Sequence, residues 1–238
     1  MRGVYSLCMA AAQPLLRRKL ARRGAVEPGY LEAVEERFGR YGAPTAPGRL
    51  WIHAVSLGET RAAAILIDAL RAERPALRVL LTHGTATGRA AGAQLLRDGD
   101  TQAWLPWDTP GAVRRFLDQF QPSAGVLMET EVWPNLSAAC AQRGLPLALV
   151  NARLSEKSLA QSARLAFLSR PAYASLKAVW AQTEGDAQRL TQAGASVTGV
   201  MGNLKFDALP EPALVAQGQA WRERAGAHVV MFASSREG

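Results

Sequence analysis

The sequence has few of the residues that build disulfide frameworks or structural metal sites. Its 238 residues include two cysteines, Cys8 and Cys140, which lie far apart in unlike contexts. A disulfide framework is therefore not expected, and a reducing compartment fits best. The three histidines, His53, His83 and His228, show no metal-ligand spacing with the cysteines. We predict that the protein needs no metal.

Long hydrophobic runs are missing, and so are acidic residues in the first 23 positions. The apolar run at residues 4–16 is broken by Gln13 and Pro14 and is shorter than the roughly 20 residues that span a bilayer. Six basic residues lie in the same segment: Arg2, Arg17, Arg18, Lys19, Arg22 and Arg23. The net charge is +8, and the rest of the chain has only 22 basic against 20 acidic residues. Because the positive charge is concentrated here, a nucleic-acid partner is not expected.

Residues 1–23 are interpreted as a basic apolar segment that lies on an anionic membrane surface, where basic clusters bind favourably. Basic residues that follow an apolar run tend to keep the next part of the chain in the cytoplasm. Two alternatives remain open. Ala10, Ala11 and Ala12 are small enough for the cleavage site of a secretory signal peptide. The segment also fits a frayed terminus without function.

From residue 50 onward, short apolar runs alternate with longer stretches of helical period. Strands are predicted at 50–55, 78–82, 101–105, 125–128, 146–150, 178–182 and 197–201. Helices are predicted at 59–73, 87–97, 110–120, 134–143, 157–167 and 184–193. This alternation predicts an α/β, doubly wound domain of Rossmann type over residues 24–207. Such domains bind ligands outside the carboxyl ends of their strands.

The pattern changes after residue 207. Residues 208–212 contain Pro210 and Pro212 and are predicted to be a linker. A helix is expected at 213–225 and a strand at 228–233, after which the sequence ends. Because a lone strand cannot bury its faces, residues 213–238 are expected to begin a second α/β domain whose remainder is missing.

The strongest local signal is His-Ala-Val-Ser-Leu-Gly-Glu at residues 53–59, where the first predicted strand ends. Gly58 permits a tight turn, and Glu59 then lies at a helix N-terminus, where unpaired N–H groups favour its ionised form. An ionised carboxylate at a cleft can accept a proton from an attacking hydroxyl. The alternative is that Glu59 only stabilises the first helical turn.

Two more strand ends bear polar groups. Thr-His-Gly-Thr-Ala-Thr-Gly at 82–88 is rich in small residues whose N–H groups can bind a phosphate, or it is an ordinary turn. It has neither the lysine of a P-loop nor the spacing of a dinucleotide fingerprint. Glu129 and Glu131 follow the fourth strand, beside Trp133 and Pro134. A carboxylate beside an apolar wall is a candidate site, and a helix-start charge pair is the alternative.

The last predicted strand of the domain leads into Gly-Asn-Leu-Lys-Phe-Asp at 202–207. Lys205 lies where a cleft between two domains would open, and a lysine there can neutralise a phosphate of a ligand or leaving group. A solvated surface lysine is the alternative.

Together these segments, in this order, resemble the 3-deoxy-D-manno-octulosonic acid (Kdo) transferases of lipopolysaccharide synthesis. The resemblance also includes Arg-Phe-Gly-Arg-Tyr at 37–41 and Asn-Ala-Arg-Leu-Ser at 151–155, and residues 234–238 resemble the start of that family's second half. Six ordered matches are far more specific than any one of them.

The resemblance implies a two-domain GT-B glycosyltransferase whose first domain takes the lipid acceptor. It implies transfer of Kdo from CMP-Kdo to the lipid A precursor (lipid IVA), without a metal or other cofactor, at the cytoplasmic face of the inner membrane. It assigns Glu59 as the general base and Glu129 and Lys205 as transition-state stabilisers. The residues expected against the acceptor are Gly58, Thr85, Thr87 and Arg153.

The sequence departs from the family in lacking most of the second domain, through which CMP-Kdo would bind. A chain of this length is expected to bind acceptor without catalysing transfer. The alternative function is therefore a non-catalytic module that docks on an anionic membrane or lipid. A nicotinamide-dependent dehydrogenase is disfavoured, because no dinucleotide fingerprint follows the first strand.

Overall fold

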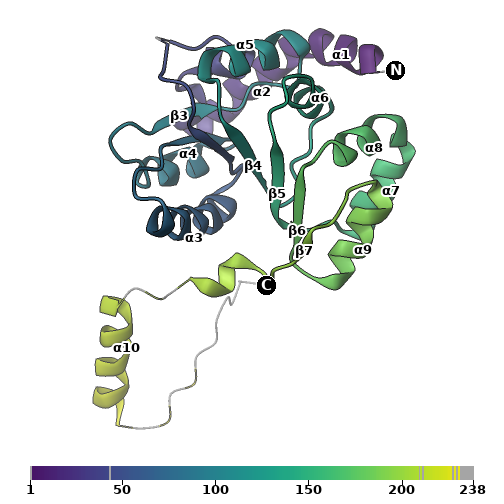
Figure 1. Ribbon diagram of the computed structural model, residues 1–238. Coiled ribbons are helices and arrows are strands. Elements are labelled where there is room, and N and C mark those ends of the chain that lie inside the picture. Colours follow the sequence, from purple (N-terminus) through teal and green to yellow (C-terminus); the bar gives the residue numbers. More distant parts are fainter. Residues whose placement is uncertain are drawn as a thin grey trace. The chain divides into compact units, whose positions relative to one another are not determined.

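The computed structural model describes residues 2–42, 44–208, 210, 212–226, 228 and 230. The chain divides into two compact units, Met1–Phe206 and Asp207–Gly238. Each unit is described by itself (Figure 1).

The first unit is built on one parallel sheet of seven strands in the order β3-β2-β1-β4-β5-β6-β7. The strands are β1 (Leu50–His53), β2 (Val79–His83), β3 (Thr101–Trp104), β4 (Ala124–Met128), β5 (Leu147–Ala152), β6 (Ala178–Ala181) and β7 (Gly199–Val200). All seven lie within one or two residues of the predicted positions. The order reverses between β1 and β4, as in doubly wound folds, so the predicted fold class is confirmed.

Helices cover both faces of this sheet (Figure 1). They are α3 (Leu57–Glu73), α4 (Ala86–Ala93), α5 (Pro110–Phe120), α6 (Pro134–Gln142), α7 (Glu156–Arg164), α8 (Ala166–Ala174) and α9 (Glu184–Ala193). Six correspond to predicted helices. One of the six, the helix predicted at 157–167, is divided into α7 and α8 at Leu165, whose φ of −118° and ψ of 34° lie outside the helical region.

Two hydrophobic clusters fill the space between the sheet and its helices. Successive strand residues point to opposite faces, so Trp51 belongs to the cluster with α5 and α6, and Ile52 to the cluster with α3. By the same alternation, Leu127 belongs to the cluster with α5 and α6, and the adjacent Met128 to the cluster with α3. Because both faces are covered, the strands are apolar at nearly every position, which is why the sequence revealed them.

Five of the strand-to-helix turns in the sheet are closed by hydroxyl caps. Ser56, Thr85, Thr109, Ser155 and Thr183 each accept a hydrogen bond from the backbone N–H three residues later. Each cap satisfies one of the unpaired donors of its helix. The caps fix where each helix begins, at the edge of the sheet where ligands bind in this fold.

The N-terminal segment is more structured than its composition indicated. It forms α1 (Arg2–Ala11) and α2 (Gln13–Val26), followed by the short 3-10 helices η1 (Pro28–Leu31) and η2 (Val34–Phe38). Leu20 of α2 is buried in a third cluster with Tyr30, Phe38 and Trp104. No helix among the described residues has the length and apolar character needed to cross a bilayer.

The second unit contains α10 (Pro212–Ala225), which confirms the helix predicted at 213–225. None of its residues is buried, and Leu214 and Trp221 are exposed. The strand predicted at 228–233 lies outside the described residues, apart from positions 228 and 230.

Candidate active site

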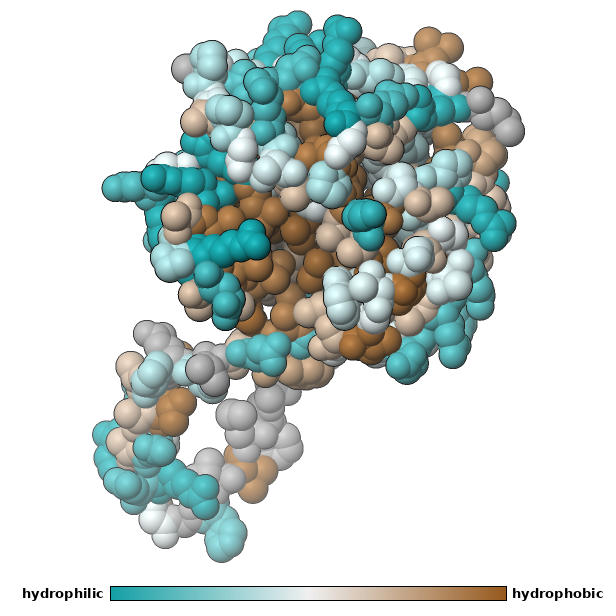
Figure 2. Space-filling model, in the orientation of Figure 1, coloured by the Kyte–Doolittle hydropathy of each residue, from teal (hydrophilic) through white to brown (hydrophobic). Residues whose placement is uncertain are grey.

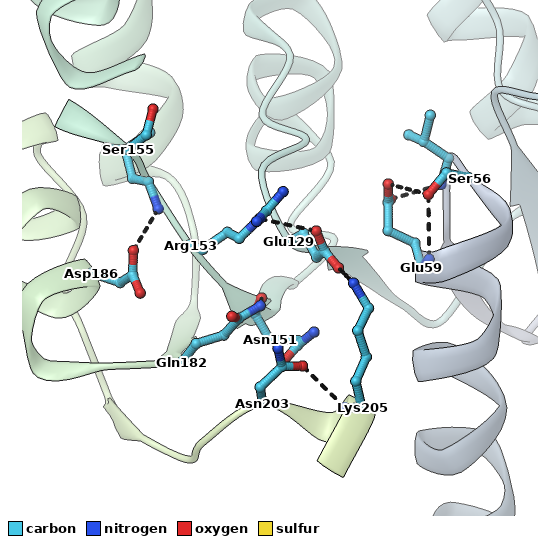
Figure 3. A network of polar contacts seen from close by, with 12 residues as sticks. Ser56, Glu59, Glu129, Asn151, Arg153, Ser155, Gln182, Asp186, Asn203 and Lys205 are labelled. Carbon is cyan, nitrogen blue, oxygen red and sulfur yellow. Dashed lines mark hydrogen bonds and ion pairs between the residues drawn. The ribbon is translucent and has the colours of Figure 1, made fainter. Parts of the chain in front are cut away.

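The candidate site lies where the chain leaves strands β1, β4, β5 and β7 (Figure 3). Four predicted residues from separate segments meet there: Glu59 on α3, Glu129 after β4, Arg153 after β5 and Lys205 on η3 (Leu204–Asp207). In Figure 3, Lys205 reaches toward Glu129, and Ser56 and Glu59 lie beside them at the start of α3.

Glu59 is held by the turn that precedes its helix. The backbone N–H of Val55 donates to its Oε2 at 2.8 Å, and the Ser56 hydroxyl donates to its Oε1 at 2.9 Å. Ser56 in turn accepts from the Glu59 N–H at 3.3 Å. These reciprocal bonds resemble a capping box, so Glu59 does stabilise the first turn of α3. The side chain is nevertheless only half-buried, so the two interpretations of Glu59 are compatible.

Burial determines the acidity of Glu59. The helix N-terminus favours the ionised form, but burial raises the pKa of the carboxyl above its ordinary 4.5. The hydrogen bonds from Val55 and Ser56 oppose this rise without cancelling it. The pKa therefore shifts opposite to the direction that helix position alone predicts, because desolvation of a carboxylate outweighs a partial helix charge here. A higher pKa makes the ionised carboxylate a stronger base.

Glu129 is a buried carboxylate held between two cations. Only 5% of the residue is exposed, and its oxygens lie 2.8 Å from Lys205 Nζ and 3.2 Å from Arg153 Nε. Its backbone is left-handed, with φ +58°, which is costly for a residue with a side chain. This conformation turns the chain sharply at the end of β4. Strained backbone of this kind persists only where the surrounding contacts hold it in place, and it is concentrated at functional sites.

Lys205 lies beside the start of α3 as well as beside Glu129. A Cβ built on Gly58 would lie 3.7 Å from Lys205 Nζ, so the lysine ammonium group packs along the glycine that precedes Glu59. Gly58 thus brings the lysine next to the carboxylate that follows it. The predicted residues Gly58, Glu59, Glu129, Arg153 and Lys205 therefore form one cluster.

Asn151 is a residue of this cluster that sequence reasoning missed. It is fully buried and left-handed at φ +54°, and its Oδ1 accepts the Leu204 N–H at 3.1 Å. Asn151 therefore holds the turn that positions Lys205. Its Nδ2 has no hydrogen-bond partner among the described residues, a costly state for a buried donor. Asparagine tolerates left-handed backbone, but nothing local in the sequence shows which turn its side chain will bind.

Glu131 does not pair with Glu129 at the strand end. Burial, reinforced by the charge of Glu59, raises the pKa of Glu131 to about 7. Glu129 faces Lys205 and Arg153 instead. Alternation along an extended strand would turn positions 129 and 131 to the same face. That alternation stops because β4 ends at Met128 and Glu129 is left-handed.

The loop at 82–88 borders the Glu59 turn through backbone contacts. The N–H groups of Gly84 and Thr85 both donate to the Val55 carbonyl. Thr85 also caps α4 and donates its hydroxyl to Val55 O at 3.0 Å, so its side chain has structural partners. Thr87 is exposed. Contact of Thr85 and Thr87 with an acceptor stays a prediction.

The cluster is suited to proton abstraction beside a positive charge. Glu59 offers a basic carboxylate, and Lys205 offers an ammonium group that is 44% exposed in its side chain. Among the described residues, no three His, Cys, Asp or Glu side chains are grouped as metal ligands. That the reaction needs no metal remains a prediction.

Replacing Ser56 with alanine is expected to lower the free energy of unfolding by about 1 kcal/mol, because α3 loses its N-cap. It is also expected to raise the pKa of Glu59 further, since the lost hydrogen bond favours the ionised form. Urea denaturation and a carbon-detected NMR titration of the Glu59 carboxyl measure the two effects. The matched control is Thr183→Ala, which removes the same kind of cap from α9. An unchanged Glu59 pKa in Ser56→Ala would contradict the geometry.

Comparison with known proteins identifies relatives over this part of the chain. Residues 32–208 match the family model described as 3-deoxy-D-manno-octulosonic-acid transferase (kdotransferase). The 3-deoxy-D-manno-octulosonic acid transferase of Bordetella pertussis is 51% identical over 100% of this chain and 57% of its own length. The Haemophilus influenzae enzyme of the same name is 30% identical, over 87% of this chain and 49% of its own length.

A third relative, matched over a shorter part of the chain, is the probable mitochondrial 3-deoxy-D-manno-octulosonic acid transferase of Arabidopsis thaliana. It is 42% identical over 52% of this chain and 28% of its own length. The chain thus spans about half the length of the two bacterial relatives. All the candidate residues at 58–205 lie inside the matched family region.

Proposed function

The chain belongs to the 3-deoxy-D-manno-octulosonic-acid transferase family, and we propose that, within a complete two-domain protein, it transfers Kdo from CMP-Kdo to lipid IVA. The observation that carries this proposal is the meeting of Glu59 with the Glu129–Lys205 pair, within the region that matches the family. The proposed architecture of the whole protein is GT-B, with CMP-Kdo bound mainly by the second domain.

The proposed reaction is a displacement at the anomeric carbon of Kdo. A glucosamine hydroxyl oxygen of lipid IVA forms the new bond, and the bond from that carbon to the CMP phosphate oxygen breaks. The bonding pair leaves with CMP, and Glu59 takes the hydroxyl proton. Negative charge develops on the phosphate, so a nearby ammonium group such as that of Lys205 stabilises the transition state. Glu129 fixes the position of that lysine and balances its charge, while Arg153 pairs with the other carboxylate oxygen of Glu129.

The acceptor is proposed to lie over the start of α3, between the 82–88 loop and Arg153. Arg153 is well suited to contact it, because 61% of its side chain is exposed while its Nε pairs with Glu129. Figure 2 shows a hollow in the middle of the first unit where apolar residues gather, surrounded by hydrophilic ones. An apolar hollow suits an acceptor that has acyl chains.

A transfer assay tests the function. A version that includes both domains should convert lipid IVA and CMP-Kdo to a Kdo-bearing lipid, detected by mass spectrometry, while residues 1–238 alone should give no product. Binding of lipid IVA by the two-domain protein without any transfer would overturn the proposal. That result would favour the alternative, a non-catalytic module that docks on lipid.

We further propose that the protein is peripheral on the cytoplasmic face of the inner membrane and docks through α2. Arg18, Lys19 and Arg22 are exposed on this helix, and they line a hollow of about 540 Å³ together with Leu15 and Val26. Leu15 is 69% and Val26 87% exposed, so apolar and basic groups face solvent together. This combination favours an anionic bilayer surface.

Neutralising Arg18, Lys19 and Arg22 together as glutamines is expected to weaken binding to anionic liposomes by about a hundredfold, since each contributes about 1 kcal/mol. Deleting residues 1–23 is a poorer test, because Leu20 belongs to the third hydrophobic cluster. Sedimentation with phosphatidylglycerol vesicles measures the effect. The control neutralises three other exposed cations, Arg74, Lys157 and Arg164. Equal losses in the two triple variants would mean that α2 is not the docking helix.

A further inference from the structure

A second basic cavity, of about 690 Å³, lies between α1, α5 and α6. Its lining includes Arg2 from α1, Arg114 from α5 and Arg143 just after α6, and no acidic residue. These elements differ from those that present Glu59, Glu129 and Lys205. The cavity is therefore distinct from the candidate active site in its residues and in its charge.

The arginines of this cavity are not fully neutralised by the protein. Arg143 pairs with Asp118 at 2.8 Å. Within the described part of the chain, Arg2 and Arg114 form no ion pair. Asp108 acts on Arg2 through its charge, but its side chain is bound by the Asn135 and Leu136 N–H groups and the Tyr5 hydroxyl. Guanidinium groups left without carboxylates are well suited to bind a phosphate.

Helix α1 is fixed over the cavity by two polar contacts. The Tyr5 hydroxyl donates to Asp108 Oδ2 at 3.0 Å, and the Ser6 hydroxyl donates to Asn135 Oδ1 at 3.0 Å. These bonds join α1 to the loop before α5 and to the start of α6. Arg2 is therefore placed by the docking of α1, although no hydrogen bond or ion pair within the described residues holds its side chain.

The outer side of α1 is apolar and adjoins the cavity. Gly3 lines the cavity, and Leu7 lies one helical turn further along the same side. Leu7 is 70% exposed, and the neighbouring Val4 is 66% exposed. A free phosphate ion gains nothing from such neighbours. A phospholipid does, because its phosphate enters the cationic cavity while its acyl chains meet the apolar side of α1.

We infer that this cavity binds the phosphate headgroup of an anionic phospholipid of the membrane. The inference rests on the proposed membrane association, and it adds a headgroup site separate from the dispersed charge of α2. Two attachment sites, one on α2 and one between α1 and α5, would limit rotation of the domain on the bilayer. Its orientation toward a membrane-embedded acceptor would then be restricted.

The test uses the two-domain protein and vesicles of phosphatidylcholine with or without phosphatidylglycerol. Arg114→Gln is expected to weaken binding to the anionic vesicles about tenfold, because one headgroup contact is lost. The matched control, Arg74→Gln, removes the same charge from the exposed end of α3 and should change binding less than twofold. Leu7→Gln should also weaken binding, since it removes part of the apolar side.

Equal effects of Arg114→Gln and Arg74→Gln would overturn the inference, as would absence of wild-type binding to anionic vesicles. Inorganic phosphate alone separates the two sources of the anion. Suppose that inorganic phosphate binds wild-type protein but not Arg114→Gln, and that Leu7→Gln binds vesicles as well as wild type does. The cavity then binds a free phosphate, and its assignment to a phospholipid is wrong. Kdo transfer to detergent-dispersed lipid IVA should be unaffected by Arg114→Gln, so failure of this site is distinguishable from failure of the transferase proposal.

Discussion

Replacing Glu59 with glutamine in the two-domain protein is expected to lower kcat for Kdo transfer by about a thousandfold or more. A glutamine amide cannot take the hydroxyl proton, and a general base contributes about 10²–10⁴ to the rate. The substitution should leave the fold intact. The amide oxygen can still accept the Val55 N–H, and the amide nitrogen can donate to Ser56 Oγ. Single-turnover transfer from CMP-Kdo to lipid IVA, followed by mass spectrometry, measures the loss.

The control for this variant is Glu73→Gln, an exposed glutamate at the other end of α3. It removes the same charge from the same helix without touching the cluster, so transfer should proceed at the wild-type rate. If Glu59→Gln also transferred Kdo at nearly that rate, Glu59 would have no role as base.

The pH dependence of transfer follows from the raised pKa of Glu59. The base works only when ionised, so the rate should fall as the pH drops through that pKa. Burial places the acid limb above pH 4.5, the ordinary value for a glutamate. Measuring kcat against pH tests this. The residual activity of Glu59→Gln should not fall with decreasing pH in this way. If the wild-type rate fell only at or below pH 4.5, the inference that burial raises the pKa of Glu59 would be wrong.

Replacing Lys205 with methionine is expected to lower kcat between a hundred- and a thousandfold. The ammonium group that stabilises the departing phosphate is lost, and loss of one such donor has effects of this size. Within the part of the chain that the structure describes, the same change leaves the buried Glu129 carboxylate with Arg153 as its remaining cationic partner. The rate of Kdo transfer at saturating substrate measures the effect, and thermal unfolding confirms that the protein is folded.

A double-mutant cycle separates the effect of Lys205 on the departing phosphate from its ion pair with Glu129. If Lys205 acts only by neutralising Glu129, then Glu129→Gln should restore activity to Lys205→Met. If the ammonium group acts on the reacting phosphate, the double variant should stay as slow as Lys205→Met. Lys177→Met, at an exposed lysine before β6, serves as the control. Wild-type rates in Lys205→Met would exclude the proposed role.

The sheet could be predicted because its signals are local. Most of the parallel strands are buried on both faces and are therefore apolar at consecutive positions, and the helices have a period of their own. The polar residues that follow these strands were predictable candidates for the same reason, because the carboxyl ends of parallel strands lie at one edge. The resemblance to a known family rested on those same segments.

The contacts within the site were not predictable from local signals. Lys205 pairs with Glu129 across 76 positions of the chain, and nothing near either residue shows that they meet. The role of Asn151 depends on the position of Leu204, which comes from a different strand end. The packing of the N-terminal helices was not predicted either. Their contacts with Phe38, Trp104 and Asp108 join distant parts of the chain, so no local signal in the sequence indicates them.

The amino-acid sequence by itself determined the order of strands and helices, the concentration of positive charge near the N-terminus and the polar residues available at each strand end. These depend on composition and spacing, which act over a few residues. Only the tertiary structure decided that Lys205 faces Glu129, that the pKa of Glu59 rises rather than falls, and that three arginines line a cavity beneath α1. Those properties arise from burial and from distances between segments, and both exist only once the chain has packed.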